Sequence, residues 1–191
     1  IHKEHSLAAE SATQTQVAPV RLSLTEFQAV AEQIMLRIGE GEGQFPITKA
    51  TNHWLGLNSA SILEPMVKLV RLTGSTEYLD FCRYIVSTGG AEGLNIFDRA
   101  YENVLKPYQY GVAKAYEMMS CYDGIIELYR VTGCERYIEA VKAFWEILYK
   151  YESNILGSVG YCERFAAGAS YCDAATEVCD VIHWMRICYE L

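Results

Sequence analysis

Apolar side chains recur along most of this chain at the three- and four-residue spacing of amphipathic helices. The first stripe runs from Phe27 to Ile38, behind Ser23 and Thr25, residues that commonly start helices. Further stripes predict helices over 58–73, 76–87, 112–131 and 135–152, a shorter one over 93–104, and a last one that begins near Asp173 or Thr176. Between 153 and 172 the pattern breaks into short apolar pieces between glycines, which indicate loop or strand. The pattern therefore predicts an all-α fold of antiparallel helices joined by short turns.

Two parts of this pattern are copies of one another. Residues 68–80, KLVRLTGSTEYLD, recur 59 positions later as ELYRVTGCERYIE at residues 127–139. Each copy reads as a helix end, a glycine cap (Gly74 or Gly133) and the start of a partner helix. One helix pair cannot bury its own apolar face, so repeated hairpins predict a toroid or solenoid of stacked pairs. Residues 184–191 look like a third copy that stops before its turn.

Composition narrows the class of protein. A hydrophobic content of 51% suits a globular domain, which we expect over 23–191, whereas the polar, aperiodic residues 1–22 predict an extended or disordered leader. The net charge of −8 without a basic patch argues against nucleic acid or an anionic membrane as a partner. No apolar run approaches the ~20 residues that span a bilayer. There is no signal-peptide pattern, and the localisation stays open.

The cysteines divide into two groups. Cys82, Cys121 and Cys188 lie within helical patterns, where a free cysteine behaves as a small buried apolar residue. Cys162, Cys172 and Cys179 gather in or next to the irregular stretch. Reduced thiols are the favoured interpretation for a chain of this size, with a secreted protein as the alternative.

The irregular stretch also carries the strongest candidate chemistry, because loops inside regular repeats often hold function. Glu163 lies in it, and Glu177 and Cys179 follow at the start of the last helix. In the first turn of a helix a glutamate and a cysteine two apart can meet and supply half of a zinc site. Spacing alone favours a simpler alternative, a solvated glutamate beside a buried cysteine.

A second candidate site precedes the helix that starts near residue 58. His53 and Trp54 offer the combination of stacking and hydrogen bonding that often holds sugars, although a core tryptophan beside a capping histidine is an equally ordinary explanation. His183 is interpreted as a hydrogen-bonded or core histidine.

Several motifs, in order, resemble the β-L-arabinofuranosidase-like proteins of glycoside hydrolase family 127. They are NHWLGLN at 52–58, ASILEPM at 60–66, AKAYEMMS at 113–120, GSVGYCERF at 157–165 and TEVC at 176–179. The resemblance covers roughly residues 45–191. It implies a partial (α/α)6 toroid, a six-hairpin architecture, forming an incomplete catalytic domain truncated at its C-terminus.

The resemblance also assigns roles. It implies a retaining glycosidase with Glu163 as general acid/base, zinc held by Glu177 and Cys179, and His53 and Trp54 on the sugar. The zinc-bound cysteine nucleophile belongs to an adjacent cysteine pair that lies outside this chain. Lys114 departs from the family pattern, which has a sugar-contacting histidine there, so the substrate is less well specified than the fold.

The sequence is therefore compatible with two functions from different classes. The first is a glycoside hydrolase acting on a carbohydrate, inactive as this fragment alone. The second is a non-catalytic helical repeat module that binds carbohydrate or protein on its concave face. With two zinc ligands the chain alone is expected to bind zinc weakly at best. The last helix should also leave Val181, Met185 and Cys188 without a partner, so we expect homo-oligomerisation or crystal contacts to cover them.

Overall fold

Helices dominate this computed structural model, which describes residues 23–166 and 176–191. The predicted leader and Cys172 lie outside the described residues. In chain order the helices and strands are α1 (Leu24–Arg37), α2 (Leu57–Ala60), α3 (Leu63–Thr73), α4 (Thr76–Ser87), β1 (Gly90–Ala91), β2 (Leu94–Asn95), α5 (Ile96–Glu102), α6 (Ala115–Thr132), α7 (Glu135–Ile147) and α8 (Val178–Glu190). Short 3-10 segments cover Ile47–Lys49, His53–Gly56 and Pro107–Gln109, and one π-helical turn covers Leu148–Glu152.

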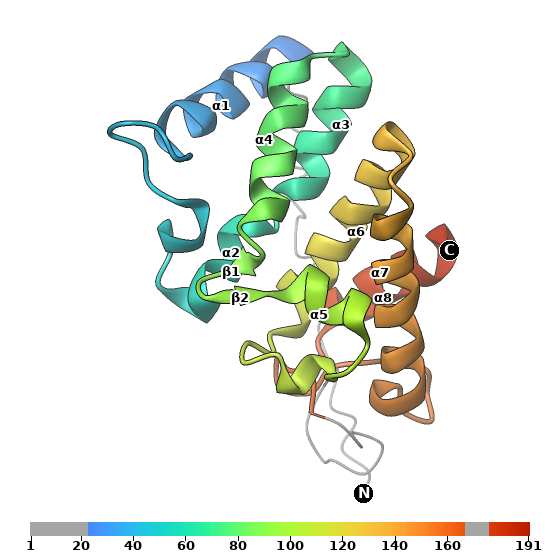
Figure 1. Ribbon diagram of the computed structural model, residues 1–191. Helices are drawn as coiled ribbons and strands as arrows, with labels where there is room; N and C mark the ends of the chain where they lie inside the picture. The colour runs from blue at the N-terminus through green and yellow to red at the C-terminus, as the bar shows by residue number, and fades with distance from the viewer. Residues whose placement is uncertain (1–22, 167–175) are drawn as a thin grey trace, which may run out of the picture.

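The helices form hairpins that stack side by side. α3 runs back along α4, and α6 runs back along α7 (Figure 1). The first helices of the successive hairpins also pack together, α3 against α6 and α6 against α8. Tyr122 of α6 stacks on Phe144 of α7 with ring centroids 3.8 Å apart, at the centre of the core. This arrangement confirms the all-α prediction and forms part of an α/α toroid.

The sequence repeat is a structural repeat. Gly74 and Gly133 cap α3 and α6 with nearly identical left-handed backbone angles, φ 69° and 67°. The preceding threonines behave alike, since the hydroxyls of Thr73 and Thr132 both donate to the carbonyl four residues earlier, at 2.7 and 2.8 Å. Each hydroxyl also accepts from the amide two residues later. The prediction of equivalent helix ends is therefore confirmed.

Local chemistry explains where the first helices begin. Ser23 and Glu26 form a reciprocal capping box at the start of α1. The helix predicted from residue 58 is broken at Ser61 and Ile62, so α3 starts only at Leu63 and Pro65 is its third residue. A proline is tolerated in that first turn because the amide it lacks would have no partner inside the helix. The helix predicted over 58–73 thus begins later than the apolar pattern indicates.

Some details differ from the sequence predictions. The helix expected over 93–104 is the shorter α5, because residues 90–95 form a β-hairpin instead. Each of its strands has two residues, which is too short to show the alternation of apolar and polar residues that predicts a strand. Cys82 and Cys121 are buried as predicted, but Cys188 is exposed, and it accepts a hydrogen bond from the Trp145 indole at 3.2 Å. Burial of Cys188 was thus a wrong prediction.

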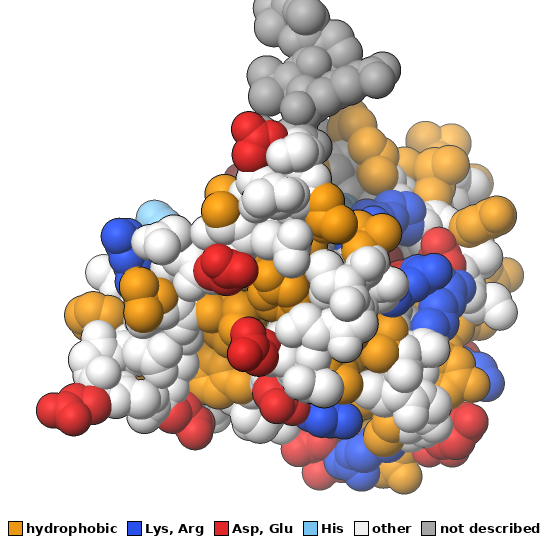
Figure 2. Space-filling view, turned by 90° about the horizontal axis from the view of Figure 1, so that it is seen from above, with side chains coloured by type: hydrophobic (Ala, Val, Ile, Leu, Met, Phe, Trp, Pro, Cys, Tyr) orange, Lys and Arg blue, Asp and Glu red, His pale blue; other side chains and the backbone are white. Residues whose placement is uncertain are grey.

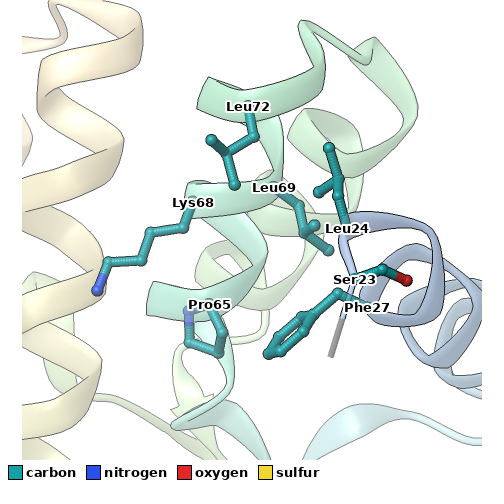
Figure 3. Close-up of a pocket in the computed structure, with 7 residues that line it drawn as sticks. All are labelled: Ser23, Leu24, Phe27, Pro65, Lys68, Leu69 and Leu72. Carbon is teal, nitrogen blue, oxygen red and sulfur yellow. The ribbon is translucent and has the colours of Figure 1, made fainter. Parts of the chain in front are cut away.

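Two helices leave apolar faces uncovered among the described residues. On α8 the side chains of Met185 and Cys188 are exposed and that of Val181 is half-buried, while Phe27 and Val30 are exposed on α1. Figure 2 shows one face of the molecule, on which hydrophobic side chains reach the surface between acidic and basic ones. A pocket of about 450 Å³ lies where α1 meets α3, lined by Ser23, Leu24, Phe27, Pro65, Lys68, Leu69 and Leu72 (Figure 3). No described helix is long and apolar enough to cross a membrane.

Candidate functional site

The irregular stretch contains a tight turn that presents Glu163. Tyr161 and Arg164 exchange backbone hydrogen bonds at 2.7 and 2.9 Å, and the two residues between them, Cys162 and Glu163, have positive φ of 42° and 71°. Positive φ at both central residues is the mark of a primed hairpin turn, which normally uses Asn or Gly. Neither cysteine nor glutamate adopts it readily, and backbone strain of this kind gathers at functional sites.

A short backbone pairing fixes this turn against the start of α6. The Ala115 amide donates to the Glu163 carbonyl at 3.0 Å, and the Phe165 amide donates to the Ala113 carbonyl at 2.9 Å. Lys114, the residue before α6, therefore lies directly opposite the turn. The pairing joins two segments about fifty positions apart and gives Glu163 a defined place.

The Lys114 ammonium is the centre of the site. Its Nζ lies 3.4 Å from Glu177 Oε2, 3.6 Å from Glu163 Oε2 and 3.8 Å from Glu117 Oε2. The side chains of Lys114 and Glu117 are each only 8% exposed, whereas Glu163 is 52% exposed. The structure thus brings Glu163, the predicted acid, and Glu177, a predicted metal ligand, to a single cation. Lys114 and Glu117 form the buried part of this site.

The charged side chains of this group shift one another's pKa values. Burial disfavours the charged ammonium, but the surrounding carboxylates of Glu117, Glu177 and Glu163 outweigh it and raise the pKa of Lys114. Burial raises the pKa of the Glu117 carboxyl, although Lys114 opposes this, and Asn58 donates to that carboxyl at 2.6 Å. One lysine faces several carboxylates here, so the site carries surplus negative charge that suits a cation.

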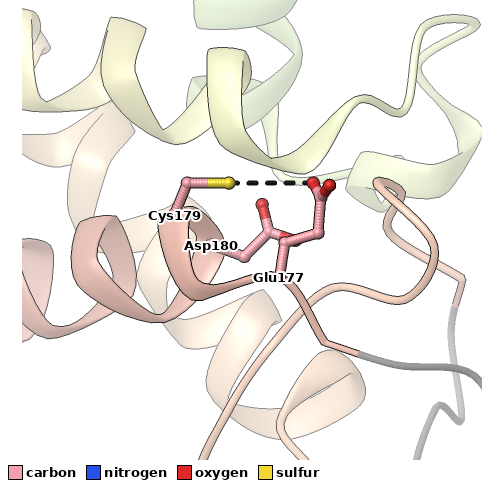
Figure 4. Close-up of side chains that lie close together, drawn as sticks. All are labelled: Glu177, Cys179 and Asp180. Atoms are coloured by element: carbon pink, nitrogen blue, oxygen red, sulfur yellow. Dashed lines mark hydrogen bonds between the residues drawn. The ribbon is translucent and has the colours of Figure 1, made fainter. Parts of the chain in front are cut away.

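The start of α8 supplies three ligand-type side chains. Glu177 is the residue before the helix, and Cys179 and Asp180 are in its first turn. Figure 4 shows the three side chains converging, with the Cys179 thiol 3.7 Å from Glu177 Oε2. Burial and the neighbouring carboxylates of Asp180 and Glu177 raise the pKa of the Cys179 thiol. Burial, followed by the charge of Glu177, raises the pKa of Asp180 to about 7.

The two predicted sugar-binding residues differ in their surroundings. Trp54 is partly buried and faces the site, with the Arg164 guanidinium 4.6 Å and the Lys114 ammonium 5.9 Å from its ring centroid. Its backbone lies in the left-handed region at φ 52°, and so does that of Leu55 at φ 54°. His53 is exposed and makes no hydrogen bond with the described residues. The structure therefore brings Trp54 to the acidic cluster and leaves His53 at the surface beside it.

A second polar cluster joins the first helices of successive hairpins. His183 of α8 lies 2.5 Å from Asp123 of α6, and Arg186 contacts both Asp123 and Glu64 of α3. The Tyr116 ring meets the His183 ring edge-on. This confirms that His183 is a buried, hydrogen-bonded histidine. The cluster links α8 to α6 and α3.

Sequence reasoning missed three members of the site. Asp180 stands beside a predicted ligand, three positions after Glu177, which is the spacing of one helix face and could have revealed it. Glu117 lies three positions after Lys114 and was hidden in an ordinary helical pattern. Arg164 directly follows Glu163 in the sequence, and nothing local signals that it lies on Trp54.

Comparison with known proteins gives one match. The family model described as "Beta-L-arabinofuranosidase, GH127 catalytic domain" matches residues 12–191. No curated protein and no solved structure matches the chain.

Proposed function

Because this chain belongs to the GH127 family of β-L-arabinofuranosidase catalytic domains, we propose that its acidic cluster forms part of the active site of a retaining β-L-arabinofuranosidase. Family membership supports the glycoside hydrolase class and a carbohydrate substrate. The stereochemistry, the metal and the residue roles belong to the proposal. The observation that carries it is the single ammonium of Lys114 in contact with both Glu163 and Glu177.

Glu163 has the role of general acid/base. A retaining glycosidase needs a carboxylic acid that protonates the leaving oxygen and later takes a proton from water. Glu163 is half exposed on its strained turn, so a sugar can reach it, and a bound sugar would exclude the water around it. Lys114 holds the carboxylate in position between steps.

Zinc is the proposed cofactor, and the donors at the start of α8 fit it. A thiolate and a carboxylate on one tetrahedral zinc ion are roughly 3.6 Å apart for bond lengths of ~2.3 and ~2.1 Å. The Cys179 sulfur and a Glu177 oxygen are 3.7 Å apart. When bound, zinc would keep a cysteine nucleophile ionised at neutral pH and moderate it as a leaving group. That nucleophile is assigned to a cysteine pair outside these 191 residues.

Trp54 provides the proposed stacking surface for the sugar ring. Its indole borders Lys114 and Arg164, and both of these can donate hydrogen bonds to sugar hydroxyls. Arg164 is exposed and has no ion pair with the described residues, so a sugar that stacks on Trp54 can displace it. His53 lies next to this surface and is proposed to position the sugar.

The test is Glu163→Gln in an enzyme that includes the cysteine pair. The substitution keeps shape but removes the proton, so the rate on an unactivated arabinofuranoside should fall on the order of 10²–10⁴-fold. The loss should shrink for aryl glycosides, whose leaving groups need little protonation. Glu139→Gln, an exposed glutamate on α7, is the matched control. Full activity of Glu163→Gln on the unactivated substrate would show that the acid is another residue.

A further inference from the structure

Arg164 is a cation without a counter-charge at the edge of the proposed active site. It is exposed, and its guanidinium makes no ion pair and no hydrogen bond with the described residues. The adjacent residue, Glu163, does not neutralise it, because the Glu163 carboxylate lies 3.6 Å from the Lys114 ammonium instead. Glu117 and Glu177 also direct their carboxylates to Lys114. The guanidinium of Arg164 is therefore left for a group that these residues do not supply.

The surrounding structure holds Arg164 in a defined place. Its backbone closes the strained turn through hydrogen bonds with Tyr161 at 2.7 and 2.9 Å, and it pairs with Lys114 in a short β-bridge. Its guanidinium lies over the Trp54 indole, 4.6 Å from the ring centroid. This contact uses the charge of the guanidinium and leaves its N–H donors free. Two parallel N–H donors of an arginine match the two oxygens of a carboxylate.

A sugar bound on Trp54 changes what surrounds Arg164. The sugar displaces the guanidinium from the indole, which removes the cation–π contact and shields the charge from water. The leaving group is then the nearest part of the substrate, because Arg164 adjoins Glu163, the proposed acid that protonates the leaving oxygen. A hydrogen bond between two ionised groups is about twice as strong as one between neutral groups. A carboxylate on the leaving group would therefore compensate Arg164 better than a hydroxyl would.

We propose that Arg164 selects substrates whose leaving group carries a carboxylate, as a uronic acid residue does. The carboxylate accepts two parallel hydrogen bonds from the guanidinium, beside the bond that is cleaved. The neighbouring acidic side chains make this selection depend on one residue. Glu163 and Glu177 repel an anionic leaving group, so such a group binds well only where Arg164 compensates it. The inference rests on the proposed function and names the substrate class on its leaving-group side.

The experiment compares two substrates that differ by one charge, with an enzyme that includes the cysteine pair. They are β-L-arabinofuranosyl disaccharides whose leaving sugar is glucuronic acid or glucuronamide. The amide keeps the shape of the carboxylate but is neutral. At neutral pH the kcat/KM of the wild type should favour the uronate by about tenfold or more, the difference between a charged and a neutral hydrogen-bond partner. In Arg164→Gln this preference should vanish or reverse.

Matched variants and a binding measurement identify the cause. Arg164→Lys keeps the charge without the paired donors, so its preference should be intermediate. Arg164→Glu should favour the uronamide. Arg83→Gln removes an exposed arginine that pairs with Asp80 on α4, and it should keep the wild-type preference. Calorimetric Kd values for free glucuronate and free glucuronamide should follow the same order in each protein.

Two results would overturn the inference. One is a wild-type enzyme that does not distinguish the uronate from the uronamide, and the other is a uronate preference that persists in Arg164→Gln. The binding measurement needs no hydrolysis, so it separates this inference from the proposed function. Uronate-selective binding by a protein that cleaves no arabinofuranoside would contradict the proposed function alone. Hydrolysis of both disaccharides at equal kcat/KM would contradict the role of Arg164 alone.

Discussion

Replacing Lys114 by methionine should destabilise the chain and tighten its metal binding. Met is close to Lys in length and apolar, so Lys114→Met removes the charge with little change in packing. Loss of the ammonium destabilises the charged form of Glu117 most, because the side chains of Glu117 and Lys114 are both only 8% exposed. Glu163 and Glu177 are 52% and 34% exposed, and water can solvate them when the ammonium is gone.

The magnitude follows from that difference in burial. Removing one partner of a buried ion pair costs about 3–5 kcal/mol, whereas an exposed pair contributes about 0–1 kcal/mol. Asn58 continues to donate to Glu117, which reduces the loss. We therefore expect the free energy of unfolding to fall by about 3 kcal/mol in urea denaturation at neutral pH. Lys142→Met, an exposed lysine on α7, is the control and should change stability by less than about 0.5 kcal/mol.

A double variant identifies the cause. Lys114→Met with Glu117→Gln removes both charges, and an uncharged pair of similar volume should recover most of the lost stability. If the double variant is as unstable as Lys114→Met alone, the stranded Glu117 charge is not the reason and the electrostatic reasoning is refuted.

The effect on metal binding has the opposite sign. A monovalent and a divalent cation ~5 Å apart in water-like surroundings repel each other by roughly 1.7 kcal/mol. Loss of the ammonium should therefore tighten Zn²⁺ binding roughly 10- to 20-fold, measured by competition with a chelator. Weaker binding would mean that Lys114 organises the ligands more than it repels the metal.

Three further predictions concern the metal, the ion pairs and the repeat. Glu177→Gln in the enzyme should lower zinc content together with activity, and unchanged zinc content by elemental analysis would exclude it as a ligand. Glu127→Gln should cost about 1 kcal/mol at pH 7, because Arg71 and Arg130 outweigh its burial and hold the pKa of Glu127 below 4.5. That loss should vanish as the pH falls through the lowered pKa, and urea titrations that show an equal loss at pH 3 would refute it. Gly133→Ala should lower stability by about 1 kcal/mol, because the strain of φ 67° is its only cost where an added Cβ meets nothing within 4 Å.

The fold was predictable because its signals are local. The caps at Gly74 and Gly133 depend on a few neighbouring residues, and the repeat places both in one architecture. Helix ends were less accurate where tertiary contacts decide them. The segment predicted to be helical from residue 112 becomes so only at Ala115, because Ala113 and Ala115 pair with the Glu163 turn instead.

The site was predictable only in part because its contacts are distant in sequence. Glu177 and Cys179 could be paired from one helix turn, but Lys114 meets Glu177 across 63 positions. No periodic pattern carries that information, and Asp180 reads locally as an ordinary acidic residue at a helix start. The family resemblance supplied the link between Glu163 and Glu177, and the structure adds the lysine that joins them.

The repeat separates the residues that hold the hairpins together from the residues proposed for chemistry. Arg71 at the end of α3 pairs with Glu127 of α6, and Arg130 at the end of α6 pairs with Glu190 of α8. The same arginine of the repeat thus binds the next hairpin each time, near the C-terminal ends of these helices.

The proposed site lies at the opposite ends. Lys114 precedes α6 and Glu177 precedes α8, so both stand at helix starts, away from the arginine ladder. Substitutions at Glu127 should therefore change stability without changing metal affinity, whereas Lys114→Met should change both. This division explains why the repeat is clear at residues 68–80 and 127–139, where the packing recurs. The irregular turn around Glu163 has no counterpart there, because it serves one site and not every hairpin.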